Sequence, residues 1–410
     1  MKKLPDGWKE VKLSDILESI ENGNRPKGGI TDLKDGIPSI GGEHINSTGG
    51  FNLKNVRLIP EHFYNSMSRG KIQKEDVLVV KDGATTGKVS LVGSDFPYED
   101  AAVNEHVFIL RGKKDLVYQK YLFYHLYSPI GQRQMDANFH GAAIGGINTQ
   151  FIKNYDLVLP PLPTQKKIAA VLEKAEKFRE WRKEADGLTD RFLKSTFLEM
   201  FGDPMENPKM WELRKLGEIG EVSSGLTLNG QRSADKNNMF PYLRVANVFR
   251  NILDLKEIKY IHASDSEYNK FLLRKNDILI VEGHGNIEEI GRAAIWKGEI
   301  PNCLHQNHLI RVRLDNKYMN PYFLSYFLNG YGNYGYFSSE SRTTSGLNTI
   351  STNKVREAKV SLPPISLQQK FASIVQQVEQ VRQHQKESKQ QIDHFFNMLM
   401  QKAFNGELEL

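Results

Sequence analysis

Residues 159–181 read LPPLPTQKKIAAVLEKAEKFREW, and residues 362–384 read LPPISLQQKFASIVQQVEQVRQH. The two stretches lie 203 residues apart, and the same spacing separates Trp8 from Trp211 and Phe201 from Phe404. Solenoid repeats have units of roughly 20–50 residues, so a unit of this length is a whole domain with a connector. The sequence therefore predicts a tandem repeat of two related halves.

Each stretch predicts a long helix behind an extended, proline-rich segment. Thr164 and Ser366 stand where an N-cap would be, and Ser366 with Gln369 has the spacing of a capping box. Apolar residues then recur at steps of three and four, which is typical of a coiled-coil seam, here with a polar centre. The helices should be matched in length at roughly 35 residues, or about 50 Å, and glycines 202 and 406 should end them. The predicted seam comprises Ile168, Val171, Ala175, Phe178, Trp181, Ala185, Leu188 and Phe192 in the first copy, and Phe371, Ile374, Val378, Val381, Gln385, Ser388, Ile392, Phe395 and Leu399 in the second.

Between these landmarks the two copies agree only in outline, because their offsets drift while the order of motifs is kept. Short β-branched runs bounded by Gly and Asp predict strands at 77–80, 107–110, 278–281 and 309–312. Aromatic-rich runs predict short helices at 118–127 and 318–328. Each variable part is therefore expected to be a mixed α+β domain of about 150 residues.

Composition narrows the class of protein. A chain of 410 residues, 39% hydrophobic and 25% charged, suits a globular protein with more than one core. It shows no basic-then-apolar leader and no run of about 18 apolar residues, so we expect neither export nor membrane insertion, and a cytoplasmic location. The one cysteine, Cys303, excludes an internal disulfide and is expected to be a buried small hydrophobe. A net charge of +6 with a pI of about 9.0 favours a polyanionic partner.

Motifs for catalysis are incomplete. The stretch KDGATTGKVS at 81–90 resembles a phosphate-binding loop, but Gly83 and Gly87 enclose three residues rather than four, and Val89 stands where Ser or Thr must bind magnesium. We expect a glycine-rich hairpin there instead. No Asn- or Asp-Pro-Pro-aromatic tetrapeptide of the amino-methyltransferase kind occurs, and the triplets at 10–12 and 257–259 lack the Pro-Asp partner of a nuclease site.

Histidines offer two further patterns. Cys303, His305 and His308 resemble metal ligands, but a structural zinc site needs four ligands, and no second pair lies nearby. We therefore expect no metal and no cofactor. His106 and His308 occupy equivalent places in the two copies. Equivalent placement suits a shared structural role as readily as a contact with DNA, and the sequence leaves both open.

Taken together, these features resemble the specificity subunit of type I restriction–modification systems. The residues that carry the resemblance are Trp8 and Trp211, the two proline-rich helix starts, MFGDP at 200–204 and QKAFNGEL at 401–408, and it spans essentially the whole chain. It implies an α+β fold with two target-recognition domains, residues 1–157 and 203–359, and two conserved helical regions, residues 158–202 and 360–410. It also implies that the two long helices pair antiparallel as a coiled coil, giving an internal pseudo-two-fold repeat with the recognition domains at opposite ends.

The resemblance further implies a non-catalytic subunit that binds double-stranded DNA and no membrane. Its helices would dock methyltransferase subunits, normally two, with translocase-nuclease subunits joining the complex. An approximate two-fold axis would let each end read its own half-site, and because the variable domains differ, the half-sites should differ too. Two alternatives remain, a free-standing two-domain DNA-binding regulator and a nuclease with an unrecognised site.

Side chains that read DNA should be basic or amide groups on glycine-rich loops, since Arg and Lys reach guanine edges and Asn and Gln reach adenine. Asn229 and Gln231 are amide neighbours of the second set. The predicted DNA-binding residues are Arg25, Lys27, Lys81, Lys88, Arg133 and His140 in the first domain, and Arg232, Arg244, His284, Arg292 and Arg342 in the second.

Overall fold

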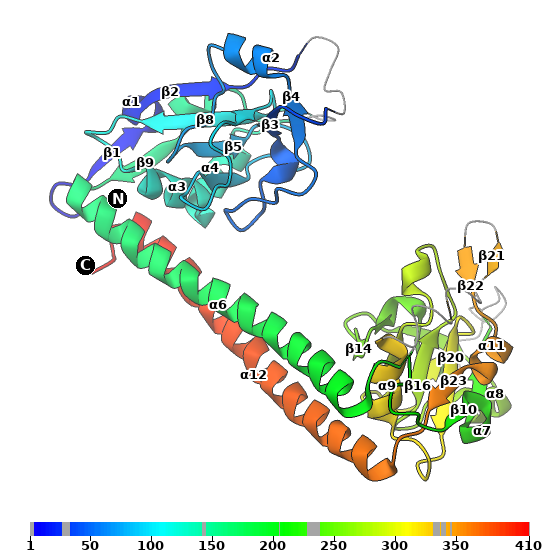
Figure 1. Ribbon diagram of the computed structural model, residues 1–410. Coiled ribbons are helices and arrows are strands. Elements are labelled where there is room, and N and C mark those ends of the chain that lie inside the picture. The colour runs from blue at the N-terminus through cyan, green and yellow to red at the C-terminus, as the bar shows by residue number, and fades with distance from the viewer. Residues whose placement is uncertain are drawn as a thin grey trace. The chain divides into compact units, whose positions relative to one another are not determined.

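The structure, a computed structural model, describes residues 4–26, 33–141, 145–204, 206–227, 238–330, 337, 342–344 and 347–409. The chain divides into two compact units. Unit 1 comprises Met1–Lys183 with Lys386–Leu410, and unit 2 comprises Glu184–Gln385. Each unit therefore combines one variable part of the sequence with one half of each long helix (Figure 1).

Unit 1 is built on a four-stranded antiparallel sheet in the order β2-β8-β5-β6. A three-stranded sheet, β4-β3-β7, and a two-stranded ribbon, β1-β9, complete it. All four residues of the central strand β5 are buried, as expected for an apolar run covered on both faces. The strands are β1 (Lys9–Lys12), β2 (Leu17–Asn22), β3 (Ile37–Ile40), β4 (Arg57–Ile59), β5 (Val77–Val80), β6 (Val89–Leu91), β7 (Ala102–Val103), β8 (Val107–Gly112) and β9 (Asp156–Leu159).

Helices cover this sheet and join it to the long helices. The largest apolar cluster of unit 1 gathers residues from α3, from the start of α6 and from the end of α12. The helices are α1 (Leu13–Ile16), α2 (Glu61–Ser66), α3 (Gln119–Tyr127), α4 (Pro129–Ala137), α5 (Phe151–Asn154), α6 (Leu162–Phe201) and α12 (Ile365–Phe404).

Unit 2 repeats this plan with its own sheets. The four-stranded sheet has the order β11-β20-β16-β18, and β15-β12-β19 and β10-β23 correspond to the smaller sheets of unit 1. Unit 2 has two further sheets, β13-β14 and β17-β22-β21, which have no counterpart among the sheets of the described residues of unit 1. The elements are β10 (Leu213–Lys215), α7 (Leu216–Ile219), β11 (Gly220–Ser224), β12 (Met239–Leu243), β13 (Val248–Phe249), β14 (Ile252–Leu253), β15 (Lys259–His262), α8 (Asp265–Phe271), β16 (Ile278–Val281), β17 (Gly283–His284), β18 (Ala293–Ile295), β19 (Leu304–His305), β20 (Leu309–Leu314), α9 (Pro321–Asn329), β21 (Arg342–Thr344), β22 (Leu347–Thr349), α11 (Thr352–Glu357) and β23 (Lys359–Ser361).

The four predicted strands are confirmed as β5, β8, β16 and β20, and the two predicted short helices as α3 and α9. The long helices are also confirmed, at 40 residues each. Glycines with positive φ follow both, Gly202 at +80° and Gly406 at +71°. Left-handed backbone of this kind is what glycine supplies at helix ends.

The N-cap prediction is wrong for both long helices. The helix α6 begins at Leu162, ahead of Thr164, and α12 begins at Ile365, ahead of Ser366. The carbonyl of Pro161 accepts hydrogen bonds from the N–H groups of Thr164 at 2.9 Å and Gln165 at 3.0 Å, which places Thr164 inside the first turn. Pro363 and Pro364 precede α12 in the same way, since proline has no N–H to leave unpaired at a helix start.

The predicted seam is correct at the helix ends and wrong nearer the middle. Phe371 and Ile168 are fully buried, but Val381 and Phe395 are 49% and 46% exposed, whereas Phe396, which was not predicted, is buried. A helix with 3.6 residues per turn drifts by about 20° per heptad against a 3.5-residue pattern, so the buried stripe moves by one position. The first copy behaves likewise, and its exposed seam residues are Phe178, Trp181, Leu188 and Phe192.

The helix halves pair antiparallel within unit 2. Gln385 Nε2 donates to Thr189 Oγ1 at 3.1 Å, and further along the rings of Phe197 and Phe371 lie 5.3 Å apart, so numbers rise on α6 as they fall on α12. In unit 1, Arg179 Nε lies 2.9 Å from the Asp393 carboxylate. The contact of Gln385 with Thr189 confirms a polar centre in the predicted seam, whereas Arg179 and Asp393 were not part of that prediction. Figure 1 shows the two helices side by side.

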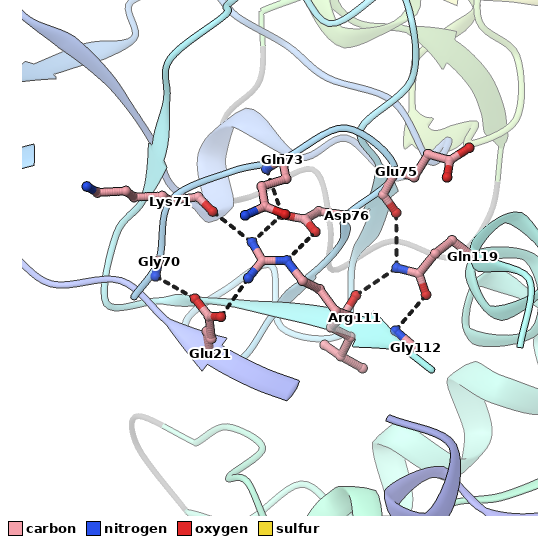
Figure 2. A network of polar contacts seen from close by, with 10 residues as sticks. Glu21, Gly70, Lys71, Gln73, Glu75, Asp76, Arg111, Gly112 and Gln119 are labelled. Carbon is pink, nitrogen blue, oxygen red and sulfur yellow. Dashed lines mark hydrogen bonds and ion pairs between the residues drawn. The ribbon is translucent and has the colours of Figure 1, made fainter. Parts of the chain in front are cut away.

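A half-buried guanidinium connects the strands of unit 1 (Figure 2). Arg111 on β8 binds both carboxylate oxygens of Asp76, at 2.7 and 2.8 Å, and one oxygen of Glu21 on β2 at 2.6 Å. Burial is the largest single influence and opposes the charge, but the contacts with Asp76 and Glu21 together outweigh it and raise the pKa of Arg111. In unit 2, Arg313 binds Asp277 with the same bidentate geometry, at 2.8 and 2.6 Å. Because the same pair recurs in both units, it belongs to the shared fold.

Candidate nucleic-acid interface

The stretch that resembles a phosphate loop is a hairpin, as the sequence predicts. It joins the antiparallel strands β5 and β6. The N–H of Gly87 donates to the carbonyl of Val80 at 2.9 Å, and Gly83 and Gly87 have φ of +87° and +85°. Thr85 Oγ1 donates to Gly42 O at 3.3 Å, which brings the turn after β3 beside the hairpin. The glycines thus make a tight turn rather than a phosphate cradle.

A second segment joins the hairpin from about 60 residues downstream. The N–H of Ile147 donates to the carbonyl of Lys81 at 2.7 Å, and Gly146 forms β-bridges with both Asp82 and His140. The predicted residues Lys81 and His140 are therefore brought to one group of loops. We call the group in each unit the loop platform; in unit 1 it consists of Arg25 and residues 81–87, 104–106, 140–141 and 145–147.

A chain of ion pairs crosses the loop platform of unit 1. Arg25 NH2 lies 2.7 Å from Glu105 Oε1, and the same oxygen lies 3.3 Å from His106 Nε2. His106 Nδ1 lies 2.5 Å from Asp82 Oδ1, and Lys81 Nζ lies 3.7 Å from the other oxygen of Asp82. Arg25 and Lys81 are thus positioned by carboxylates at this surface.

The remaining predicted residues of the first domain lie around or outside this group. Lys88 ends the hairpin, where its carbonyl accepts from the N–H of Val80 at 2.9 Å. Arg133 is exposed on α4, and the neighbouring Gln132 donates to the carbonyl of Gly87 at 3.0 Å. Lys27 lies outside the residues that the structure describes.

Unit 2 builds the same platform from different side chains. The N–H of Gly291 donates to Val281 O at 2.9 Å, that of Glu282 donates to His308 O at 3.0 Å, and that of Ile350 donates to Glu282 O at 2.9 Å. Each bond has its counterpart in unit 1, so Glu282 stands where Lys81 stands and His308 where His106 stands. In unit 2 the platform consists of residues 282–291, 306–308 and the described residues of 342–350.

Two predicted residues, His284 and Arg342, lie on this second platform. His284 is on β17, which pairs with β22, and β22 in turn pairs with β21, where Arg342 opposes Thr349. His284 Nδ1 accepts from the N–H of Asn286 at 3.0 Å. Asn348 Nδ2 donates to the carbonyl of Gly285 at 3.2 Å, so an amide side chain also joins the group.

Two other arginines of the second domain are already paired. Arg292 is only 6% exposed, its NH1 lies 2.8 Å from Glu289 Oε2, and its guanidinium stacks 5.1 Å from the centre of the Phe249 ring. The hydrogen bond from Arg292 lowers the pKa of Glu289. Arg244 is half-buried and pairs with Glu257 at 3.1 Å. Asn229, Gln231 and Arg232 lie outside the described residues.

Cys303 and His305 belong to the interior of unit 2. Cys303 is 1% exposed within an apolar cluster, and burial raises the pKa of its thiol to about 12, which confirms the expected buried hydrophobe. His305 is fully buried, and its Nδ1 lies 3.0 Å from Phe271 O. Among the described residues no group of three or more His, Cys, Asp and Glu side chains is arranged to hold a metal ion.

Sequence reasoning missed the carboxylates of the platform. Asp82, Glu105 and Glu282 each hold a basic side chain, but acidic residues carry no DNA-binding signal of their own. The only sign of these contacts in the sequence is that Asp82 is adjacent to Lys81 and Glu105 is adjacent to His106. Only the fold shows that Glu282 and His308, 26 residues apart, are in contact.

Similarity to known proteins agrees with this arrangement. Residues 5–184 and 208–394 match the model of the type I restriction modification DNA specificity domain. The chain is 25% identical to the type I restriction enzyme EcoKI specificity subunit of Escherichia coli (strain K12), covering 99% of this chain and 90% of that one. It is equally 25% identical to the StySPI specificity subunit of Salmonella potsdam, with the same coverage.

Solved structures share the fold. A chain from a study of complex assembly and conformational transition of the type I R-M system superposes with a TM-score of 0.64, at 20% identity and with full coverage of both chains. The S subunit from M. genitalium gives a TM-score of 0.53 at 17% identity, covering 98% of this chain and 97% of that one. No helix in the described part of the chain is long and apolar enough to cross a membrane. With two matched segments that together span most of its length, the chain belongs to the family of type I restriction modification DNA specificity domains.

Proposed function

We propose that this chain is the non-catalytic DNA-specificity subunit of a type I restriction–modification enzyme, and that each variable domain reads one half of a bipartite target. The observation that carries the proposal is a loop platform built twice on the same backbone with different side chains. Lys81 in unit 1 corresponds to Glu282 in unit 2, since each takes the same hydrogen bonds to its histidine and to the isoleucine downstream. Because the two loop platforms share a backbone but carry different side chains, the two half-sites should differ in sequence.

We further propose that the DNA-contacting set is drawn from the predicted residues on these platforms. In unit 1 they are Arg25, Lys81 and His140, and in unit 2 His284 and Arg342. Carboxylates hold Arg25 and Lys81 in place at the surface, and a positioned cation loses less conformational freedom on binding than a free one. The net charge of +6 favours association with DNA, and this contribution should weaken as salt rises.

The proposal also assigns the boundaries of the domains. Residues 1–157 and 203–359 are the recognition domains, and residues 158–202 and 360–410 are the helical regions that set the spacer between half-sites. Large apolar side chains on α6 support docking of partner subunits: Phe178 and Trp181 in unit 1 are 49% and 59% exposed, and Leu188 and Phe192 in unit 2 are 53% and 52% exposed. We propose two methyltransferase subunits there, with restriction subunits joining the complex, all in the cytoplasm.

Co-expression with the methyltransferase subunits, followed by mapping of methylated DNA sites, tests this function. We expect methylation at one interrupted, asymmetric sequence that disappears when the chain is omitted. A single uninterrupted site, or the same methylation pattern without this chain, would refute the proposal. Gel-shift measurements between 50 and 200 mM salt on the mapped site provide a second check, because phosphate contacts should make the affinity fall steeply.

A further inference from the structure

Two exposed histidines, His106 and His308, occupy the same place in the two units. His106 O accepts from Lys81 N at 2.9 Å, and His308 O accepts from Glu282 N at 3.0 Å. A carboxylate holds each ring through Nδ1, since His106 Nδ1 lies 2.5 Å from Asp82 Oδ1 and His308 Nδ1 lies 2.9 Å from Glu282 Oε2. On both platforms a carboxylate thus holds the ring through the same nitrogen, Nδ1.

The carboxylate reaches the ring from two different backbone positions. Glu282 takes the place of Lys81, as the shared hydrogen bond to the histidine carbonyl shows, whereas Asp82 is one residue further along. The carboxylate–histidine pair therefore recurs although the residue that supplies the carboxylate does not. A geometry that is built twice from non-equivalent residues indicates that the ring orientation is used in both units.

A purely structural role does not account for the exposure of these rings. The side chains of His106 and His308 are 43% and 46% exposed. The interior histidines His44, His125 and His305 are at most 2% exposed. An ion pair this exposed to solvent contributes little to stability. The pair therefore orients a surface ring rather than holding the core together.

The free nitrogen of the ring differs between the units. A carboxylate can only accept a hydrogen bond, so Nδ1 of His308 carries the proton. In the neutral ring with this tautomer, Nε2 is a hydrogen-bond acceptor. Nε2 of His308 contacts no polar partner within the described residues. In unit 1 the equivalent nitrogen lies 3.3 Å from Glu105 Oε1, which also binds Arg25 at 2.7 Å. There both ring nitrogens are occupied, and Arg25, 47% exposed, is the group left facing outward.

We propose that this platform presents a different reading group in each unit. His308 Nε2 accepts a hydrogen bond from the exocyclic amino group of adenine or cytosine in the second half-site. In the first half-site Arg25 donates to guanine, and His106 is a positioning residue that holds Glu105 and, through it, Arg25. These pairings match the major-groove edges of the bases. The inference rests on the proposed function and adds to it which residues give the two half-sites their difference.

The experiment uses the full chain co-expressed with its methyltransferase subunits, and the methylated sites are mapped for each variant. His308→Ala should reduce the preference at one base pair of the second half-site about tenfold and leave the first half-site unchanged. Glu282→Ala should relax the same base pair. Glu282→Gln should retain the preference, because its amide oxygen still accepts from Nδ1. Arg25→Ala and His106→Ala should both relax one base pair, the same for each, in the first half-site.

Lys256→Ala, an exposed change outside the platform, serves as the control and should leave the mapped target intact. The inference is overturned if His308→Ala leaves the target unchanged or weakens every base pair evenly. It is equally overturned if His308→Ala lowers the unfolding temperature as much as His305→Ala, because the ring would then be structural. Should the unmodified chain direct no bipartite methylation at all, the proposed function itself fails, which is a separate outcome.

Discussion

The start of each long helix is anchored by one fully buried glutamine, and removing its amide should destabilise one unit selectively. Gln165 Oε1 accepts from the N–H of Tyr118 at 2.8 Å, and its Nε2 donates to the carbonyls of Leu116 at 2.9 Å and Pro160 at 2.8 Å. Gln368 makes the matching three bonds in unit 2. Gln165→Met keeps the approximate volume and removes all three hydrogen bonds.

The expected loss of stability follows from the number of hydrogen bonds removed. A buried hydrogen bond contributes about 1 kcal/mol net, so three lost bonds should lower the free energy of unfolding of unit 1 by about 3 kcal/mol. A change of 1.4 kcal/mol is tenfold in an equilibrium constant, so exchange of the most protected amides should accelerate by roughly 100-fold. Gln368→Met should have the same effect on unit 2.

Hydrogen exchange measured by mass spectrometry resolves the units, because β5 and β8 report on unit 1 while β16 and β20 report on unit 2. Lys166→Met, on the exposed neighbour of Gln165, controls for the substituted side chain. Faster exchange of β5 and β8 with little change in β16 and β20 is the expected result. If Gln165→Met exchanged no faster than Lys166→Met, or if both units accelerated equally, the glutamine would not be the anchor that its hydrogen bonds suggest.

Three further predictions address the proposed function and the interior. Exchange of residues 8–157 for the first variable domain of another family member should change one half-site and leave the other, and a methylation map showing both changed would contradict independent reading. Insertion of four helix-forming residues after Lys183 lengthens α6 by about 6 Å, so the mapped spacer should grow by one or two base pairs. An active enzyme with an unchanged spacer would show that the helices do not set the distance between the half-sites. Burial lowers the pKa of His305 to about 3, so the stability that its neutral form provides is complete above the unfolded pKa of about 6.5 and is lost as pH falls from there towards 3. At pH 5 the free energy of unfolding should have fallen by about 2 kcal/mol for this reason. His305→Gln should remove that part of the acid sensitivity of unit 2, as measured by urea titrations.

Local patterns predicted most of the fold. The strand at 278–281 was predicted at its observed bounds because four apolar residues in a row leave little choice once both faces are covered. The 203-residue spacing between Gln165 and Gln368 marked the repeat, and the structure shows why these residues keep their place, since each closes the same three-bond anchor. Helix starts were less predictable, because Thr164 has the chemistry of an N-cap and lies within the first turn all the same.

The candidate site was only partly predictable. Arg25, Lys81 and His140 were predicted singly as DNA contacts, and the structure brings them to one platform while leaving that role untested. Arg292 was predicted on the same grounds, yet it is buried against Phe249 and paired with Glu289. Its sequence neighbours resemble those of an exposed loop arginine, so nothing local distinguishes the two cases.

By itself the sequence determined the tandem repeat, the strands and the long helices, because these depend on periodicities and spacings along one stretch of chain. The tertiary structure decided which carboxylate holds which histidine, and whether a loop arginine is exposed or buried. The contact between Glu282 and His308 requires two strands to end side by side, and the one between Arg25 and Glu105 joins residues 80 positions apart. Such pairings depend on the packing of the whole domain, since a charge is stabilised by whatever partner the fold brings within reach.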